Sequence, residues 1–153
     1  MKDYLKFRSA LQSFARQFDG NGSIQTPCGA NVSPTKAHAI MEIGATNGKC
    51  LNQKELATLL GLNKSNISRL IQSLEKSSFI KRVISDSDKR ALLLELTAKG
   101  KKMCKRLELS SKKYIEELLG HIPKSKHKDL IETLEVLNRA NSLLKEVKNE
   151  KNI

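Results

Sequence analysis

Apolar residues recur every three or four positions along several stretches of this chain, and that spacing predicts amphipathic helices. The first stretch ends at residues 19–22 (DGNG), a cluster of helix breakers, and a loop through Cys28 follows it. Ser33-Pro34 then predicts a new helix ending near residues 47–48, with serine as its N-cap and proline at its first position. The apolar positions of the first stretch are Tyr4, Phe7, Leu11, Phe14 and Phe18.

Two further helices are predicted after residue 100, separated by a break from Gly120 to Pro123. The last helix has a seam of residues in steps of four and three, which is the spacing of a heptad repeat. Such a seam forms one face of an intramolecular core, or it packs against a second subunit with Asn141 setting the register. The pattern alone leaves both interpretations open. The seam positions are Leu130, Leu134, Leu137, Asn141 and Leu144.

Residues 51–76 predict two short helices joined by a tight turn. Asn52 and Glu55 have the spacing of a capping box at the start of the first helix, and Gly61 suits the left-handed turn that ends it. Asn63 is placed to cap the second helix. The predicted buried stripe of that second helix is Ile67, Leu70, Ile71 and Leu74. This order indicates a helix-turn-helix, whose second helix fits the major groove of DNA.

The other face of the second helix carries short polar side chains and cations, and it has no acidic residue before Glu75. Any solvent-exposed helix face is polar, but the absence of carboxylates favours a surface that meets an anion. Side chains of these types contact base edges and phosphates in DNA complexes. We expect Ser65, Asn66, Ser68 and Arg69 to read the bases. The whole predicted DNA-binding face of this helix is Lys64, Ser65, Asn66, Ser68, Arg69 and Gln72.

A β-hairpin is predicted next, from the β-prone runs Ile80–Ser85 and Ala91–Leu96. The five-residue connection between them is longer than the tightest hairpin loops, so its tip is expected to project. At the tip, Lys89 and Arg90 suit contacts with phosphates or a narrow minor groove, and Asp88 is placed to orient the guanidinium of Arg90. The predicted fold is therefore mainly α with a small β-wing: a winged helix-turn-helix plus N- and C-terminal dimerisation helices.

The charge of the chain supports a nucleic-acid partner. Its net charge is +12, and +8 of that lies within residues 51–106, the segment that holds the predicted helix-turn-helix and wing. The three cysteines have no CxxC spacing, which fits a reducing compartment. The N-terminus lacks the apolar segment of a signal peptide, and no run is long enough for a membrane helix. We therefore expect a cytoplasmic protein with no membrane partner.

Catalytic and metal-binding motifs are missing from the sequence. No Gly-rich phosphate loop, paired-carboxylate site or Ser/His/Asp arrangement can be assembled, so we expect no enzyme and no cofactor. Cys28, His38 and Glu42 do not have the ligand spacing of a zinc site with His121 or His127. His38 and Glu42, four residues apart, are more simply read as a pair on a helix surface, and no metal site is predicted.

The stretch LNQKELATLLGLNKSNISRLIQSLEKSSFIKR, followed by the wing pattern of Asp88, Arg90, Leu96, Thr97 and Gly100, resembles the MarR family of bacterial transcription regulators. About 50 residues match closely, and the flanking helices match in order and length. One departure is Ser77-Ser78-Phe79, which replaces the glycine-containing turn common in the family. The resemblance implies one domain over residues 1–153, with dimerisation helices and a connecting loop in 1–32 and 101–153 and the winged helix-turn-helix in 33–100.

The resemblance also implies a function: an obligate homodimer that places two recognition helices and two wings on a pseudo-palindromic operator, as a sequence-specific repressor. The recognition role falls on Ser65, Asn66, Ser68 and Arg69, and the wing role on Arg90 oriented by Asp88. The alternative is a winged-helix module for protein–protein assembly, without specific DNA readout. An assay of duplex binding across salt concentrations separates the two.

Family members usually respond to a small phenolic or lipophilic ligand, to thiol oxidation or to zinc. A small-molecule effector would bind in the cleft between the dimer helices and the winged helix, although a core role for the candidate lining residues is the better supported interpretation. Cys28, in a polar loop before a capped helix, is the candidate for a redox sensor, and an inert thiol is the alternative. The candidate residues for the effector are Phe14, Phe18, His38 and Met41.

Overall fold

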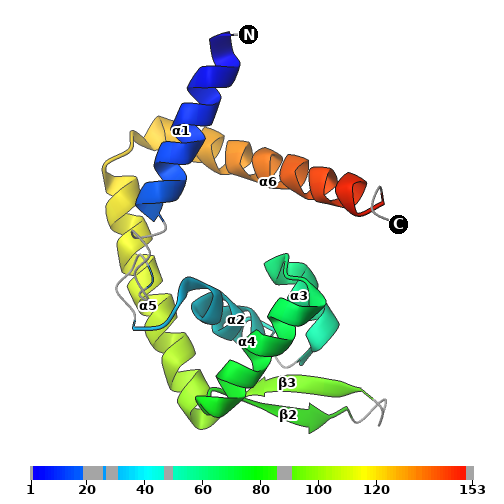
Figure 1. The fold of residues 1–153 in the computed structure, drawn as a ribbon. Coiled ribbons are helices and arrows are strands. Elements are labelled where there is room, and N and C mark those ends of the chain that lie inside the picture. Colours follow the sequence, from blue (N-terminus) through cyan, green and yellow to red (C-terminus); the bar gives the residue numbers. More distant parts are fainter. Residues whose placement is uncertain (1, 19–25, 27–30, 47–49, 86–90, 151–153) are drawn as a thin grey trace. The chain divides into compact units, whose positions relative to one another are not determined.

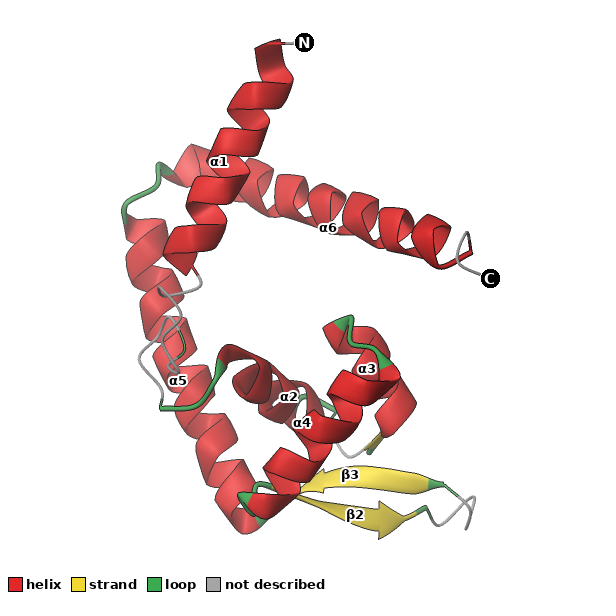
Figure 2. Cartoon of the chain, viewed as in Figure 1, coloured by secondary structure: helices red, strands yellow, loops and turns green. Residues whose placement is uncertain are grey.

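The computed structural model describes residues 2–18, 26, 31–46, 50–85 and 91–150 of the 153-residue chain. Figure 1 shows the elements and Figure 2 the balance of helix and strand, which confirms the predicted class of a mainly helical fold with a small β-wing. The helices are α1 (Lys2–Phe18), α2 (Pro34–Gly44), α3 (Gln53–Leu60), α4 (Lys64–Lys76), α5 (Ala98–Gly120) and α6 (His127–Glu150). The strands are β1 (Leu51–Asn52), β2 (Ile80–Ile84) and β3 (Leu92–Leu96), and η2 (Lys124–Lys126) is a 3₁₀ turn.

The chain divides into two compact units, Met1–Tyr114 and Ile115–Ile153, and the boundary falls inside α5. The first unit contains the helix-turn-helix and the hairpin. The second contains the end of α5, η2 and α6. The turn between α5 and α6 is held by His127, the first residue of α6. Its Nε2 lies 3.1 Å from the carbonyl oxygen of Leu119 and 2.9 Å from that of Ile122.

The helix ends in the first unit largely follow the predicted caps. At α3, the Glu55 N–H donates to Asn52 Oδ1 at 2.9 Å and the Asn52 N–H donates to Glu55 Oε2 at 2.8 Å, so the predicted capping box is present. Gly61 ends α3 with φ 62°, the left-handed conformation expected there. Asn63 caps α4 by accepting from the Asn66 N–H at 2.9 Å. These local bonds set where α3 begins and ends and where α4 begins.

Helix α2 differs in detail from its prediction. Pro34 is at the start of the helix as expected. Ser33 occupies the N-cap position, but its side chain makes no hydrogen bond to the first turn of the helix. The helix ends at Gly44, and the predicted end at residues 47–48 lies outside the described residues.

The three strands form one antiparallel sheet in the order β1-β3-β2. Ile80 pairs with Leu96 and Ile84 with Leu92, and the Ser85 N–H donates to the Ala91 carbonyl at 3.0 Å, so the pairing continues to the edge of the described hairpin. The predicted runs are therefore correct to within one residue. The short strand β1 was not predicted: Leu51 pairs with Leu94, and two residues are too few to show a β pattern in sequence.

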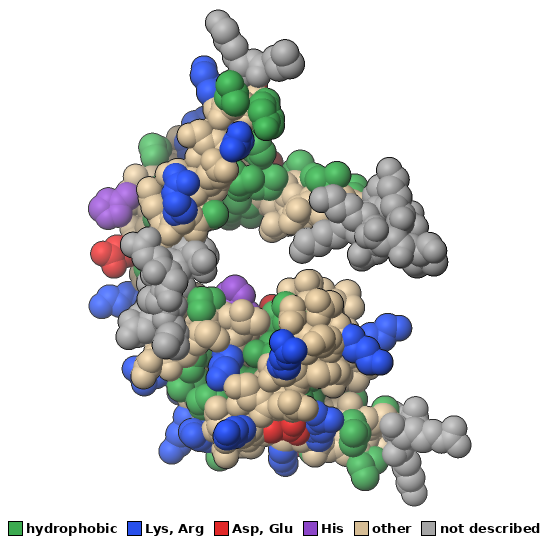
Figure 3. Space-filling model, viewed as in Figure 1, with side chains coloured by type: hydrophobic (Ala, Val, Ile, Leu, Met, Phe, Trp, Pro, Cys, Tyr) green, Lys and Arg blue, Asp and Glu red, His purple; other side chains and the backbone are tan. Residues whose placement is uncertain are grey.

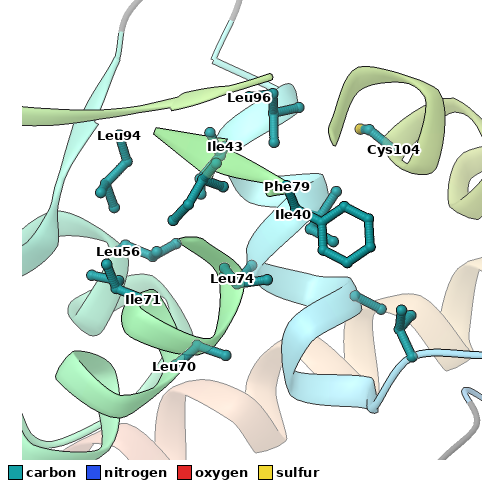
Figure 4. Packing of buried hydrophobic residues seen from close by; sticks show 14 of the residues in the cluster. Ile40, Ile43, Leu56, Leu70, Ile71, Leu74, Phe79, Leu94, Leu96 and Cys104 are labelled. Carbon is teal, nitrogen blue, oxygen red and sulfur yellow. The ribbon is translucent and has the colours of Figure 1, made fainter. Parts of the chain in front are cut away.

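The core lies between the helix-turn-helix, α2, the sheet and the first half of α5. Figure 4 shows Leu56, Ile71 and Leu74 directed towards Ile40 and Ile43 of α2, with Leu94 and Leu96 of β3 beside them and Phe79 and Cys104 at one end. The predicted stripe of α4 is buried throughout. The side chains of this core that are almost completely buried are Ile40, Leu56, Ile67, Ile71, Leu74, Leu94 and Leu107.

Helices α1 and α6 form as predicted but contribute no buried residue among those whose side chains are described. Tyr4 and Phe7 of α1 are more than half exposed. Along the seam of α6, Leu130 is 37% exposed, Leu134 41% and Leu144 63%. Both helices therefore carry apolar faces that the described chain leaves accessible.

Candidate nucleic-acid interface

Helix α4 presents the predicted reading face to solvent. Lys64, Ser65, Asn66, Arg69 and Gln72 are all exposed. The opposite side of the helix is anchored in the core through Ile67, Leu70, Ile71 and Leu74. Because α4 is capped at its start and buried along one side, its polar side chains project from a rigid support.

Ser68 differs from the other predicted readers because it is half-buried and already bonded within the protein. Its hydroxyl donates to the Lys64 carbonyl oxygen at 2.9 Å, and it accepts from Gln53 Nε2 at 3.0 Å. Gln53 is the first residue of α3, so this contact ties the two helices of the motif together. Sequence reasoning did not single out Gln53, and no local pattern would have revealed a contact between residues 15 apart.

Two ion pairs flank the reading face. Arg82 of β2 binds Glu75 of α4 in a bidentate manner, with Nε donating to Oε1 at 3.0 Å and the second nitrogen donating to Oε2 at 3.3 Å. Lys81 binds Glu95 across the hairpin at 3.0 Å. Among the described residues, Figure 3 shows Lys and Arg side chains spread over α4 and the two strands of the hairpin, with a small patch of acidic atoms on that face. Both ion pairs reduce the negative charge that an approaching polyanion would meet.

The exit from α4 is the turn Ser77-Ser78-Phe79, where the sequence departs from the family pattern. Ser78 has φ 58°, a conformation that usually requires glycine. Residues at the start of α5 hold this turn: the Thr97 hydroxyl donates to the Ser78 carbonyl at 2.6 Å and Lys99 Nζ donates to the Ser77 carbonyl at 2.8 Å. The same Thr97 hydroxyl accepts from the Gly100 N–H at 3.0 Å, so Thr97 also caps the start of α5.

Gly100 is required by this close approach. A Cβ atom at this position would overlap the carbonyl oxygen of Phe79. The start of α5 and the turn that follows α4 are therefore in direct contact, and the glycine of the wing pattern has a steric explanation.

The tip of the wing lies outside the described residues. Asp88, Lys89 and Arg90, which were predicted to contact DNA, belong to this part, so their role stays a prediction. The strands that lead to the tip are paired up to the Ser85–Ala91 bond.

Comparison with known proteins agrees with this geometry. A family model described as "MarR family" matches residues 30–91, which contain the helix-turn-helix and β2, the first strand of the hairpin. This segment of the chain is therefore similar to the MarR family. The resemblance stated from the sequence is therefore confirmed, together with its winged-helix fold.

Curated relatives match over part of the chain. The HTH-type transcriptional regulator PrsX of Escherichia coli is 32% identical over 90 residues, which are 59% of this chain and 52% of the relative. The transcriptional repressor MprA of Escherichia coli (strain K12) is 33% identical over 69 residues, 45% of this chain and 39% of that protein. The chain thus spans about half the length of PrsX and less of MprA.

The fold is also found in solved structures of low sequence identity. Streptococcus pneumoniae FabT in complex with DNA superposes with a TM-score of 0.76 and 18% identity, covering 92% of this chain and 99% of FabT. A probable transcriptional regulator from Pseudomonas aeruginosa gives a TM-score of 0.67 and 22% identity, with 87% and 94% coverage. At these identities the likeness shows the fold.

Three of the candidate sensor residues have described side chains, and these lie on α1 and α2. Phe14 and His38 are exposed, and Met41 is half-buried and packs against the core. For Met41 the core interpretation is thus supported by the packing. Cys28 and the side chain of Phe18 lie outside the described residues, so nothing in the structure bears on their predicted roles.

A cavity of about 560 Å³ lies in the first unit, and it involves two cysteines that sequence reasoning did not select. Cys50 is half-buried and Cys104 is buried. Burial raises the pKa of the Cys104 thiol to about 11, and Glu108, whose Oε1 lies 3.5 Å from Sγ, adds to the shift. The lining residues are Ile43, Gly44, Thr46, Cys50, Leu94, Glu95, Leu96, Lys101, Cys104, Lys105 and Glu108.

Within the described part of the chain, no three His, Cys, Asp or Glu side chains come together as a metal site, and no helix is long and apolar enough to cross a membrane.

Proposed function

We propose that this protein is a sequence-specific DNA-binding transcriptional regulator, a repressor that binds a pseudo-palindromic operator as a homodimer. The observation that carries the proposal is the exposed face of α4, whose polar and cationic side chains project from a capped helix anchored in the core. The DNA complex of the similarly folded FabT and the repressor MprA support the same class.

The side chains on α4 divide into two kinds of DNA contact. Arg69 and Asn66 carry the groups that bind guanine and adenine edges in a bidentate manner. Lys64 is a flexible cation suited to a phosphate, which positions the protein without reading sequence. Ser68, bonded to Gln53, is better placed to hold α3 against α4 than to read a base. Lys89 and Arg90, with Asp88 as the orienting carboxylate, are proposed as the wing contacts.

The homodimer is supported by the apolar faces of α1 and α6. Large apolar side chains that stay exposed along a regular helical stripe mark a surface that packs against another molecule. The seam of α6, with Leu130 and Leu134 more than one-third exposed, is such a stripe. A second copy of the chain supplies an equivalent stripe, and two-fold symmetry then matches two recognition helices to two half-sites.

Binding to an operator selected from random duplexes tests the proposal. Arg69→Ala is expected to cost about 1–3 kcal/mol and to relax specificity at one base pair. Arg139→Ala on α6 removes the same charge outside the unit that contains α4, so it serves as a matched control with a small effect. Equal and small effects of both variants would contradict the assignment of α4 as the reading helix.

The second candidate function is a protein–protein interaction module in which the basic face has no DNA ligand. Specific DNA binding weakens steeply as salt rises because counterions are released from the phosphates. Absence of any salt-dependent duplex binding by the wild-type protein would favour this alternative.

We also propose that a small ligand or a thiol signal modulates DNA affinity. The cavity beside Cys50 is of a size typical for small-molecule sites and supports such a signal in the first unit. Operator binding is measured before and after oxidation for the wild type, Cys28→Ser and Cys50→Ser. If oxidant-induced release survives in both variants, these two cysteines are not the sensor.

A further inference from the structure

We propose that the Glu75–Arg82 ion pair is a positioning device that sets the angle between the recognition helix α4 and the β2–β3 wing. The inference rests on the proposed DNA-binding function, which requires the helix and the wing to meet one duplex together. It is supported by the bidentate geometry of the Glu75–Arg82 contact and by the negative charge of Glu75 on an otherwise acid-free helix.

The contact is two-pronged and links two different elements. Two nitrogens of Arg82 donate to the two oxygens of Glu75 at 3.0 and 3.3 Å. A bidentate guanidinium–carboxylate pair fixes orientation as well as distance, because both groups are planar. The pair joins the last turn of α4 to the third residue of β2, and so it closes the connection between the helix and the wing.

That connection has a backbone that needs external support. Ser78 lies in it with φ 58°, a conformation that costs free energy for a residue other than glycine and persists only where the surroundings impose it. Thr97 and Lys99 hold the carbonyl groups of Ser78 and Ser77 from the side of α5. Glu75–Arg82 holds the same connection from the side of the wing, so the two sets of contacts together define the exit of the chain from α4.

The charge of Glu75 also favours a positioning role. It is the only acidic residue of α4, a helix whose exposed face is otherwise polar or cationic. A carboxylate near a DNA-binding face opposes the approach of phosphates by simple Coulomb repulsion. Electrostatics alone therefore predicts that removal of Glu75 strengthens DNA binding, whereas the positioning role predicts that removal weakens it.

The hairpin provides a matched control. Lys81, next to Arg82 on β2, pairs with Glu95 of β3 at 3.0 Å, and the carboxylate side chains of the two pairs are similarly exposed, 32% for Glu75 and 36% for Glu95. The Lys81–Glu95 pair lies within the hairpin and does not reach α4. Glu75→Gln and Glu95→Gln thus remove the same charge from two half-exposed ion pairs, but only Glu75→Gln removes the ion pair that links α4 to the wing.

The experiment compares operator affinity and the ratio of specific to non-specific binding for both variants. Glu75→Gln is expected to lower operator affinity and that ratio about tenfold, although the net charge becomes more positive. Glu95→Gln is expected to leave the ratio unchanged and to raise overall affinity slightly. Glu75→Arg alone is also expected to lower the ratio of specific to non-specific binding. The double variant Glu75→Arg with Arg82→Glu, which restores an ion pair of reversed direction, is expected to bring that ratio most of the way back to the wild-type value. Thermal unfolding checks that each variant is folded.

A second measurement does not depend on DNA. Residual dipolar couplings of backbone amides in α4 and in the β2–β3 hairpin report the angle between the two elements, and Glu75→Gln is expected to change that angle or broaden its distribution. Unchanged couplings, or a Glu75→Gln variant that binds the operator more tightly, as Glu95→Gln does, would overturn the positioning role. Wild-type protein that binds no duplex specifically would instead refute the proposed function, while the couplings still decide on the role of the ion pair.

Discussion

Leu56 of α3 is completely buried, whereas Leu134 of α6, which belongs to an equally regular apolar pattern, is 41% exposed. The difference lies in what surrounds each helix. In the first unit, α2, α3, α4, the sheet and the start of α5 close around one core. In the second unit, the described residues of α6 include no buried side chain.

This comparison shows that a hydrophobic pattern states which face of a helix is apolar but not what covers that face. The apolar side chains of the winged part are buried within their own unit, so its free energy of unfolding is expected to be independent of protein concentration. The apolar face of α6 is proposed to be buried against a second copy of the chain. Its contribution to the free energy of unfolding is therefore expected to depend on protein concentration. Substitutions in the two units test that contrast.

Leu56→Ala is expected to lower the free energy of unfolding of the winged part by about 4 kcal/mol, because it leaves a cavity in a completely buried site. Urea unfolding at several protein concentrations measures it. Leu59→Ala on the same helix is the control, since Leu59 is 56% exposed and its loss should cost little. Similar costs for the two leucines would remove the distinction between core and surface in this unit.

Gly100→Ala is expected to cost about 3 kcal/mol, because the added methyl group would collide with the backbone carbonyl of Phe79. Gly120→Ala is the matched control: nothing lies within 4 Å of a Cβ at that helical position, and alanine favours a helix. Differential scanning calorimetry should therefore show a lower melting temperature for the first variant and an equal or higher one for the second. A stable Gly100→Ala protein would mean that the contact between the start of α5 and the backbone of Phe79 is not tight.

Leu134→Lys is expected to raise the dissociation constant of the proposed dimer about 100-fold, or roughly 2.7 kcal/mol, because it places a charge in an apolar seam. Sedimentation velocity over a dilution series measures the change. Val136→Lys introduces the same side chain at a 58% exposed position off the seam and should leave the dimer intact. If both variants behave alike, the seam is not the interface.

Ser78→Gly is expected to stabilise the protein by up to about 1 kcal/mol, because glycine adopts the left-handed conformation at φ 58° without the steric cost that serine incurs. The flexibility that glycine adds to the unfolded chain offsets part of this gain. Chemical denaturation measures this gain as a higher midpoint concentration of denaturant with an unchanged m-value. A loss of stability would show that the conformation of Ser78 carries no strain for the surroundings to support.

Several features followed from the sequence because each depends on residues close together in the chain. Asn52, Glu55, Gly61 and Asn63 define the helix ends through bonds that span only a few residues. The buried stripe of α4 follows from a period of 3.6 residues. The acid-free face of α4 also followed directly from the order of residues, and apart from the half-buried Ser68 its predicted DNA-binding residues are exposed. The two strands of the hairpin were predicted to within one residue.

Other features were decided by the tertiary structure. The pairing of Leu51 with Leu94, the bond from Gln53 to Ser68 and the contact of Gly100 with Phe79 all join residues that are distant in sequence. The Glu75–Arg82 pair is nearer in sequence, but it forms only because a turn with Ser78 at positive φ brings the strand back beside the helix. Local propensity and periodicity act within a few residues, so they place helices and faces; which side chains meet across elements depends on how those elements pack.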